Sequence, residues 1–300
     1  MLTWLIVIVL AYFFFSLSSL GDKLILAGPP NPKSYTFYVG LLNILAVFAI
    51  PFAGLEIPSF KIFAWIVIDA IVFVLGLYFM FSAVEKFEVS KVATTIGATQ
   101  PIFIFFASWL FFGYQAMSGI NFLAFALLFI GSIIISLDKK LETANKYLKI
   151  TILTSLIFSL DYVLLKYIFL NFSFLQGFIW TRIFIFLIAL LFLLNKSARK
   201  EIFRQKNRSN NNFKALFFST QVCGGIATVL QSFAVSLAPV VFLPILNSLK
   251  GVQYVFLFII TSFLSFFFPK ILKEKISKKI IFKKTISIVL IVAGLALLIF

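Results

Sequence analysis

Long apolar stretches alternate with short polar segments along the whole chain of 300 residues. Ten such runs can be delimited, at about 2 to 21, 35 to 53, 62 to 83, 91 to 112, 119 to 137, 150 to 170, 174 to 194, 214 to 237, 241 to 268 and 283 to 300. Each run is close to the roughly 20 residues that a helix needs to cross a bilayer. Because backbone polar groups in lipid must bond within their own segment, the runs are expected to be helical. The pattern therefore predicts an all-α integral membrane protein with ten transmembrane helices and no separate soluble domain.

The composition supports a membrane protein and removes several kinds of chemistry. Hydrophobic residues make up 62% of the chain and charged residues only 12%. Histidine is absent and Cys223 is the single cysteine, so histidine bases, thiolate clusters and intrachain disulfides are excluded. No phosphate-binding loop of the G-x-x-x-x-G-K-S/T kind occurs. We therefore expect no metal, no cofactor, no ATP hydrolysis and no enzymatic activity.

The basic residues lie in the connections between the apolar runs rather than along one face. The chain has a net charge of +16, and 22 of its 26 lysines and arginines fall in alternate connections. The positive-inside rule then places these connections in the cytoplasm and both termini outside a cell membrane. The richest connections are 195 to 212 and 269 to 284, and in the second Leu272, Ile276 and Ile280 predict a short helix on an anionic leaflet. No nucleic-acid partner is expected, because no binding fold accompanies these charges.

The two halves of the chain share weak internal similarity. A shift of 143 residues places Phe15-Ser16-Leu17 on Phe158-Ser159-Leu160, and a shift of 151 places Ala83-Val84 on Ala234-Val235. This predicts a first five-helix repeat at 1–137, a cytoplasmic connection at 138–149 and a second repeat at 150–300 that includes the basic loop 195–212. Five spans per repeat insert the second copy in the opposite direction. The expected architecture is therefore two inverted repeats around a central cavity, which is typical of carriers.

Short motifs spread over nearly the whole chain carry a family likeness. They are Asp22-Lys23, Glu88-Val89-Ser90, Gly97-Ala98-Thr99-Gln100-Pro101, Gly177-Phe178-Ile179-Trp180-Thr181-Arg182, Asn247-Ser248-Leu249-Lys250-Gly251 and Gly294-Leu295-Ala296. Together they resemble the EamA-like family of the drug/metabolite transporter superfamily. The resemblance implies ten helices in two repeats, a central cavity and transport of small metabolites, often as export.

Two features of this chain depart from that family. The resemblance implies termini in the cytoplasm, opposite to the orientation that the charge pattern predicts. The acidic residue that is common after the fourth helix is absent, since Gly113-Tyr114-Gln115 stands there. Any role of that acidic residue is lost or moved in this chain.

Polar residues inside the runs indicate where a path for solute would lie, because they are costly in lipid. Many recur at helical spacing on single faces. The candidates for the substrate and ion path are Asp161, Lys250, Arg182, Tyr162, Asn247, Tyr254, Gln221, Thr228, Gln231, Thr95, Gln100, Trp180, Lys23 and Lys166. Helix-to-helix packing is the alternative for the small and polar members of these stripes, above all Gly224, Gly225 and the serines.

Five ionisable residues lie well inside the runs: Asp69, Asp161, Lys166, Arg182 and Lys250. Lys166 and Asp69 are near enough to span ends to extend partly outward, whereas Asp161 is near the midplane. An ion pair of Asp161 with Arg182 or Lys250 and a role in binding solute or protons are both open. Three cations against two carboxylates would suit an anionic or zwitterionic solute.

Prolines interrupt two of the runs. Pro101 lacks an N–H and clashes with the carbonyl of Gly97, so we expect a kink there beside Thr95 and Gln100. Pro244 should break the ninth run similarly, and Trp180 could supply an aromatic wall. These prolines can equally be tolerated kinks, because packed neighbours re-satisfy the backbone.

The leading hypothesis is a secondary transporter that exports small metabolites, such as amino acids or other small polar or anionic solutes, by alternating access. Asp161 is the candidate proton site if export is proton-coupled. The alternatives are a lipid or lipid-linked sugar flippase, a fixed-pore channel, and an intramembrane aspartyl protease using Asp69 and Asp161, for which the surrounding motifs are poor. The solute, its direction and the choice between monomer and homodimer stay open.

Overall fold

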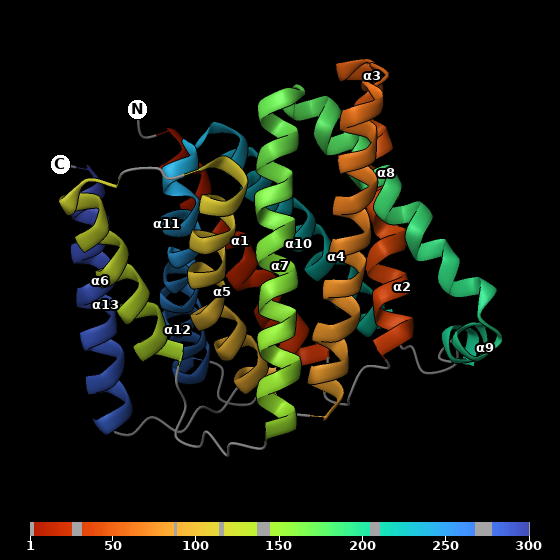
Figure 1. Cartoon of the computed structure of the whole chain (residues 1–300). Coiled ribbons are helices and arrows are strands. Elements are labelled where there is room, and N and C mark those ends of the chain that lie inside the picture. Colours follow the sequence, from red (N-terminus) through yellow and green to blue (C-terminus); the bar gives the residue numbers. More distant parts are fainter. Residues whose placement is uncertain are drawn as a thin grey trace. The chain divides into compact units, whose positions relative to one another are not determined.

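The regular structure of the chain is helical throughout its described part. The computed structural model describes residues 3–25, 32–86, 89–113, 117–136, 145–204, 211–267 and 278–299. The α-helices are α1 (Thr3–Ile25), α2 (Pro32–Leu42), α3 (Ile50–Ala53), α4 (Phe60–Lys86), α5 (Val89–Phe112), α6 (Gly119–Ser136), α7 (Asn145–Asn171), α8 (Phe174–Leu190), α9 (Lys196–Arg204), α10 (Asn211–Leu237), α11 (Leu243–Ser248), α12 (Lys250–Phe267) and α13 (Lys278–Ile299) (Figure 1). In these described ranges, the 3-10 helices η1 (Asn43–Ala49), η2 (Leu191–Leu194) and η4 (Val240–Phe242) adjoin them.

Each of the ten predicted apolar runs coincides with a helical segment to within a few residues. Eight segments of the described chain are long and apolar enough to cross a membrane, namely Thr3–Gly21, Pro32–Ala53, Phe60–Glu85, Thr95–Phe112, Lys149–Asn171, Phe174–Leu194, Phe218–Leu237 and Val240–Leu264. The segment Gly119–Ile134 is apolar but shorter. The protein is therefore a multi-pass helical membrane protein.

The two connections richest in lysine and arginine, 195 to 212 and 269 to 284, are each described only in part. The connection after α8 contains the helix α9, which lies against α2 and η2. The hydroxyl of Tyr38 donates to the carbonyl of Ile202 at 3.1 Å, and Phe37 packs on Ala198 and Ile202. Of the surface helix predicted at 269 to 284, residues 269–277 lie outside the described part, and Ile280 belongs to α13.

The chain divides into two compact units that interleave along the sequence. Unit 1 comprises 1–27, 112–140 and 210–300, and unit 2 comprises 28–111 and 141–209. Each unit therefore takes helices from both halves of the chain, so neither matches one predicted repeat. The repeat boundaries themselves stay a prediction.

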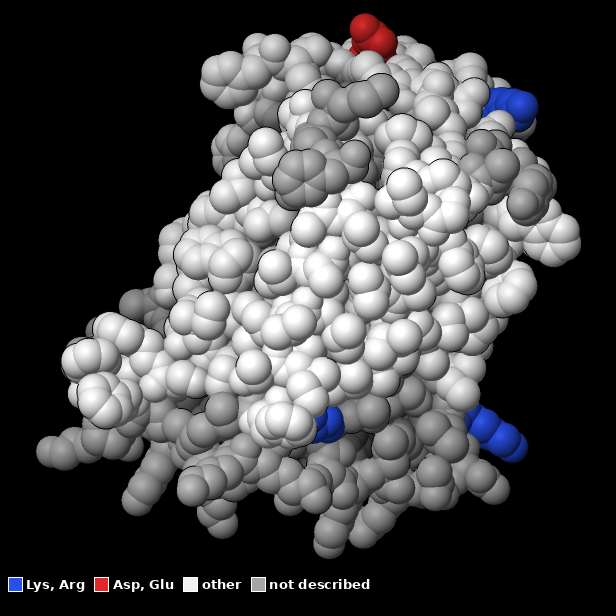
Figure 2. Space-filling model, turned by 90° about the vertical axis from the view of Figure 1, so that its left-hand side faces the viewer, with Lys and Arg blue, Asp and Glu red and all other residues white. Residues whose placement is uncertain are grey.

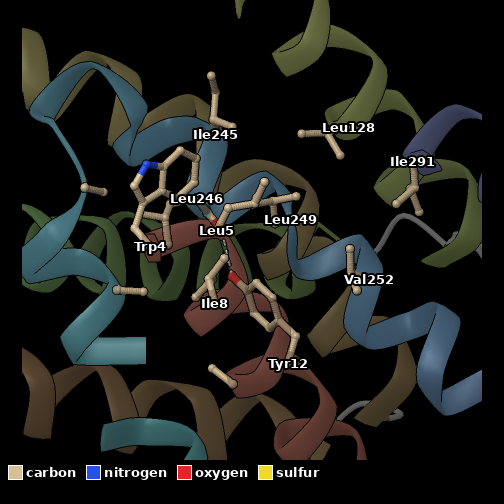
Figure 3. Close-up of a cluster of buried hydrophobic side chains, with 13 residues drawn as sticks. Trp4, Leu5, Ile8, Tyr12, Leu128, Ile245, Leu246, Leu249, Val252 and Ile291 are labelled. Atoms are coloured by element: carbon tan, nitrogen blue, oxygen red, sulfur yellow. Dashed lines mark hydrogen bonds between the residues drawn. The ribbon is translucent and has the colours of Figure 1, made fainter. Parts of the chain in front are cut away.

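In unit 1, α1 packs along α10 and α12, while α6 packs along α13 (Figure 1). Trp4, Ile8 and Tyr12 of α1 meet Leu246 and Leu249 in the main apolar core (Figure 3). Glycine permits the closest contacts, because a Cβ on Gly251 would meet Ser132 and Ile291. Small residues at such crossings are typical of helices packed in a bilayer.

In unit 2, α4 packs along α7 and α8, and α2 packs against α4 and α8. Side chains of α7 bond to α5: the Ser159 hydroxyl donates to the Gln100 carbonyl at 3.1 Å, and the hydroxyl oxygens of Ser155 and Thr99 lie 2.8 Å apart. The close approach of α4 and α7 occurs at Gly76, where an added Cβ would meet Phe158 at 2.8 Å.

The outer surface is apolar where helices are exposed. Phe52, Phe60 and Ile57 are each close to nine-tenths exposed. The face drawn in Figure 2, seen from the side of α6 and α13, shows almost no described charged side chain except near its upper and lower ends. Exposed apolar surface of this extent is expected where lipid chains replace water.

Candidate functional site

Three ionisable side chains from three helices form a buried cluster in unit 2. Asp69 of α4 is 0% exposed, Asp161 of α7 is 7% exposed and Arg182 of α8 is 4% exposed. Arg182 interacts electrostatically with both carboxyl groups, and the two carboxyl groups interact with each other. We call Asp69, Asp161 and Arg182 the acidic cluster.

The guanidinium group of Arg182 is held by one amide and two rings. Its Nη1 donates to Oδ1 of Asn43 in η1 at 3.2 Å. Its Cζ lies 4.8 Å from the ring centre of Phe178 and 5.6 Å from that of Phe73. Aromatic faces attract a guanidinium group, most strongly where water is excluded. These contacts fix the cation while leaving the cluster enclosed by apolar rings.

The carboxyl groups are less well satisfied than the guanidinium. Both carboxyl oxygens of Asp69 and Oδ1 of Asp161 are buried without a hydrogen-bond partner among the described residues. A buried ionised carboxylate without such partners is costly. Arg182 supplies one positive charge for two carboxyl groups, so full ionisation would leave the cluster itself with one negative charge. Lys166 of α7 is a further buried cation in unit 2. The cluster therefore suits uptake of a proton or a small cation.

Two predicted residues of α7 flank this cluster along the helix. Tyr162 directly follows Asp161 and is buried. Lys166 is also buried, with 2% of its surface exposed, and Asp69 is fully buried. We had expected both side chains to extend partly outward, and that expectation was wrong. Lys166 is five residues beyond Asp161, a spacing that does not place two side chains on one helix face.

The predicted proline kink lies at the seam between α5 and α7. Pro101 is inside α5, which continues through it. The Ser155 hydroxyl lies 3.4 Å from the Ile96 carbonyl, Ser159 donates to that of Gln100, and Thr99 donates to that of Thr95. The side chains of α7 thus lie at the carbonyls of Ile96 and Gln100, as helix-to-helix packing predicts, while Thr99 serves the Thr95 carbonyl within α5 itself.

Trp180 lies at the corner where α4 and α8 begin. Its Nε1–H donates to the carbonyl of Glu56 at 2.7 Å, and its ring stacks on Phe184 at 6.1 Å between centres. The side chain of Gln176, one turn earlier, donates to the carbonyls of Ala53 and Gly54 and accepts from the amide of Glu56. In this structure Trp180 therefore fixes the connection before α4.

In unit 1 the predicted residues cluster around an interruption in the ninth apolar segment. Pro244 begins α11, which ends at Ser248, and α12 begins at Lys250. Asn247 is buried at 2% exposed, whereas Lys250 and Tyr254 are half-buried. The predicted polar face therefore extends over two helices that meet at Leu249, whose backbone keeps helical dihedral angles.

The other predicted residues of unit 1 lie on α10 and α1. Gln231 hydrogen-bonds to the hydroxyl of Tyr12, while Thr228 donates to the carbonyl of Gly224 in its own helix at 2.8 Å. Gln221 is half-buried on the same helix. Lys23 lies in the last turn of α1, and its side chain is outside the described residues.

The sequence reasoning did not single out several residues that build these sites. Asn43, Phe73 and Phe178 surround Arg182, and Tyr12 contacts α11. Asn43 could have been found by the rule already used for other spans, since an amide inside the run 35 to 53 is costly in lipid. Phe73 and Phe178 could not be told apart from the rest by residue type, because the chain has 42 phenylalanines. Among the described residues, no group of three or more His, Cys, Asp or Glu side chains is placed to hold a metal ion.

Comparisons with known proteins give a fold but no activity. No protein-family model matches the chain, and the comparison with curated proteins finds no match. A solved crystal structure is similar over 97% of this chain and 94% of its own, with a TM-score of 0.67 and 15% sequence identity. The description of that protein names no function. At this identity the likeness shows a shared fold alone.

Proposed function

We propose that this protein is a proton-coupled secondary transporter that exports a small polar or anionic metabolite by alternating access between two inverted five-helix repeats. The observation that carries the proposal is the acidic cluster. Ionisable residues inside membrane spans are costly, and they mark ion or substrate pathways by default. Two carboxyl groups against one guanidinium leave a charge that a bound proton neutralises.

The packing of the helices supports an inverted repeat. The shift of 143 residues relates α1 to α7, and the shift of 151 relates α4 to α10 and α5 to α12. In unit 1, α1 packs on α10, and in unit 2 the corresponding helices α7 and α4 pack on each other. Likewise α1 packs on α12, while α7 bonds to α5. Such paired arrangements are what two oppositely inserted copies of one bundle would give.

The test is transport in proteoliposomes with a pH gradient. Radiolabelled standard amino acids are offered one at a time as the probe, and a trapped pH-sensitive dye follows protons. We expect one or more of them to move against its gradient with proton movement in the opposite direction. Asp161→Asn should abolish the coupling, whereas the exposed carboxylate variant Glu56→Gln should transport normally. Amino-acid flux that changes neither with the pH gradient nor with Asp161→Asn would refute coupling to protons.

The orientation that we propose follows the charge count, with the basic connections in the cytoplasm and the termini outside. Single cysteines at Leu2 and Lys273 in a Cys223→Ser background can be labelled in intact cells by an impermeant reagent. Labelling at Leu2 and protection at Lys273 are expected. The reverse pattern would favour the orientation implied by the family resemblance.

One observation favours a second candidate. Asp69 and Asp161 share a buried environment, as the two carboxyl groups of an intramembrane aspartyl protease must. Cleavage of a reconstituted transmembrane peptide, lost in both Asp69→Asn and Asp161→Asn, would establish that activity. Both carboxyl groups are enclosed by protein here, so a hydrolytic water would need an opening to reach them.

A further inference from the structure

The helix α9 is held against the rest of unit 2 by one of its faces. Ala198 and Ile202, four residues apart, are 2% and 0% exposed and pack on Phe37 of α2. The Tyr38 hydroxyl donates to the Ile202 carbonyl at 3.1 Å. At the start of α9, Oδ1 of Asn195 accepts from the amide of Ala198 at 3.2 Å, which caps the first turn. The helix therefore has a fixed orientation against α2.

The side of α9 that is turned away from α2 carries positive charge. Lys196, Arg199 and Lys200 are all exposed, and they lie at positions i, i+3 and i+4 of the helix. Side chains at this spacing share one face. The whole helix contains four basic residues and one acidic residue, Glu201, so its net charge is +3. Because the docked face fixes the helix, the three exposed cations stay together instead of spreading as they would on a free loop.

The same helix directly follows exposed apolar surface at the end of a membrane span. Leu191 and Leu194 of η2 are 58% and 80% exposed, and they close the span Phe174–Leu194. Exposed leucines at the end of a span contact lipid chains. Figure 1 shows α9 nearly end-on beside the lower end of α2, so its axis runs across the axes of α2 and α4. A helix that lies across the ends of spans lies along the membrane surface, at the depth of the headgroups.

The charges on this face favour an anion beside them. Lys196 and Lys200, four residues apart, repel each other, and Lys196 and Arg199 lie in the first turn, where cations oppose the helix dipole. A phosphate group relieves both effects, because its oxygens accept hydrogen bonds from several lysine and arginine donors at once. The phosphate of a phospholipid is held at headgroup depth by its own acyl chains, so it meets the cations and the exposed leucines together.

We propose that the exposed face of α9, formed by Lys196, Arg199 and Lys200, binds the phosphate groups of anionic phospholipids in the leaflet on the side of the basic connections. Leu191 and Leu194 contact the acyl chains of the same lipids. A free loop of equal charge would set the topology equally well, but it would not hold cations on one face beside apolar surface. Lipid binding at α9 does not depend on the proposed transport.

The first test compares two lipids by native mass spectrometry of the full chain in a neutral detergent. Dioleoyl phosphatidylglycerol and dioleoyl phosphatidylcholine, which have the same acyl chains, are titrated in parallel. Phosphatidylglycerol should bind at least about tenfold more tightly, because each cation near an anionic headgroup contributes about fivefold in affinity. Inorganic phosphate at the same concentration should not displace it. Equal binding of the two lipids, or displacement by inorganic phosphate, would overturn the proposal.

Matched double variants assign the binding to α9. Arg199→Gln combined with Lys200→Gln should weaken phosphatidylglycerol binding at least about tenfold. Lys61→Gln combined with Lys149→Gln is the control, because it removes two exposed lysines and the same total charge outside α9. The control should change binding less than about twofold. All four side chains are exposed, so both proteins should unfold at the temperature of the unaltered protein in lipid-free detergent. Equal lipid affinity of the two variants would refute the site.

Photocrosslinking then locates the headgroup along the chain. Phosphatidylglycerol with a diazirine in its headgroup is irradiated with the full chain in phosphatidylcholine nanodiscs, and the modified peptides are identified by mass spectrometry. Crosslinks should fall within Lys196–Arg204 and decrease at least about tenfold when Arg199→Gln and Lys200→Gln are combined. Crosslinks confined to residues 269–284 would place the anionic lipid on the other basic connection and overturn the inference.

Discussion

The two compact units handle buried polarity in different ways. In unit 2 the interior holds ionisable side chains, namely Asp69, Asp161, Lys166 and Arg182. In the described part of unit 1, the fully buried polar side chains are all uncharged, and Tyr12 and Ser132 use theirs to bond carbonyls of an interrupted helix. A buried hydrogen bond between neutral groups adds a little stability. A buried ionised group instead has a large desolvation cost unless an opposite charge or a ligand pairs with it. Among the described residues, the buried charges therefore lie in unit 2 and the interrupted helix lies in unit 1.

The largest effect should come from removing the one cation of the acidic cluster. Arg182→Met leaves two buried carboxyl groups without their counter-charge, and the loss of one partner of a buried ion pair costs about 3–5 kcal/mol. Unfolding in mixed micelles by added SDS measures this free energy. The loss should shrink as the pH is lowered, because protons neutralise the remaining carboxylates.

A compensated variant separates charge from packing at this position. Arg182→Met combined with Asp69→Asn and Asp161→Asn should recover most of the lost stability and remain inactive in transport. If it stays as unstable as Arg182→Met alone, then contacts with Phe73 and Phe178 rather than charge hold Arg182 in place.

The next effect concerns close packing in unit 1. Gly251→Ala brings a methyl group against the Ser132 hydroxyl and within 2.9 Å of the Ile291 side chain. Overpacking of this kind costs about 1–3 kcal/mol, and it should disturb the bond from Ser132 to Ser248. Gly225→Ala is the matched control, since nothing lies within 4 Å of its added Cβ. The control should be neutral or stabilising by up to about 1 kcal/mol, because alanine favours helix. Equal stability of both variants would contradict the packing described for α6, α12 and α13.

A smaller effect is expected at the interrupted helix itself. Tyr12→Phe keeps the ring in the core but removes the donor to the Leu246 carbonyl. Leaving a buried acceptor without its donor costs about 1–2 kcal/mol. The same SDS titration measures the loss, and a Tyr167→Phe variant serves as a reference hydroxyl in unit 2. A Tyr12→Phe protein as stable as the reference variant would mean that Gln231 or water replaces the hydroxyl.

The smallest effect should occur at the partly exposed corner of unit 2. Trp180→Phe loses the bond to the Glu56 carbonyl but keeps an aromatic ring beside Phe184. A single neutral hydrogen bond contributes about 0.5–1.5 kcal/mol. Thermal unfolding in detergent should show a small decrease in the melting temperature, and proton-coupled transport in proteoliposomes should be unaltered. A strong transport defect with normal stability would instead favour Trp180 as a wall of the solute path.

The sequence predicted the helices well because their cause is local. Each apolar run forms a helix to satisfy its own backbone in lipid, so run lengths fix the segments without knowledge of the packing. The sequence predicted the break of the ninth run at Pro244, but the structure has it at Leu249. Pro244 marks the start of a helix, whereas the interruption involves bonds from Tyr12 and Ser132 of other helices. The helix α9 was not predicted, because it forms against Phe37, a contact far away in the sequence.

The candidate site was predictable in its parts but not in its assembly. Asp161 and Arg182 were expected to carry function because charges inside spans are costly. That Asp69 joins them depends on how α4, α7 and α8 cross, and spacing along one chain does not specify which helices adjoin. Lys250 and Arg182 were considered together as partners for Asp161, and the structure places only Arg182 in the same compact unit.

The amide of Gln176 ties the start of α8 to the connection between α3 and α4 by three hydrogen bonds to Ala53, Gly54 and Glu56. A crosslink of this kind couples one corner of the unit so that its helices tilt together instead of separately. Any tilt of α8 would therefore also move the start of α4.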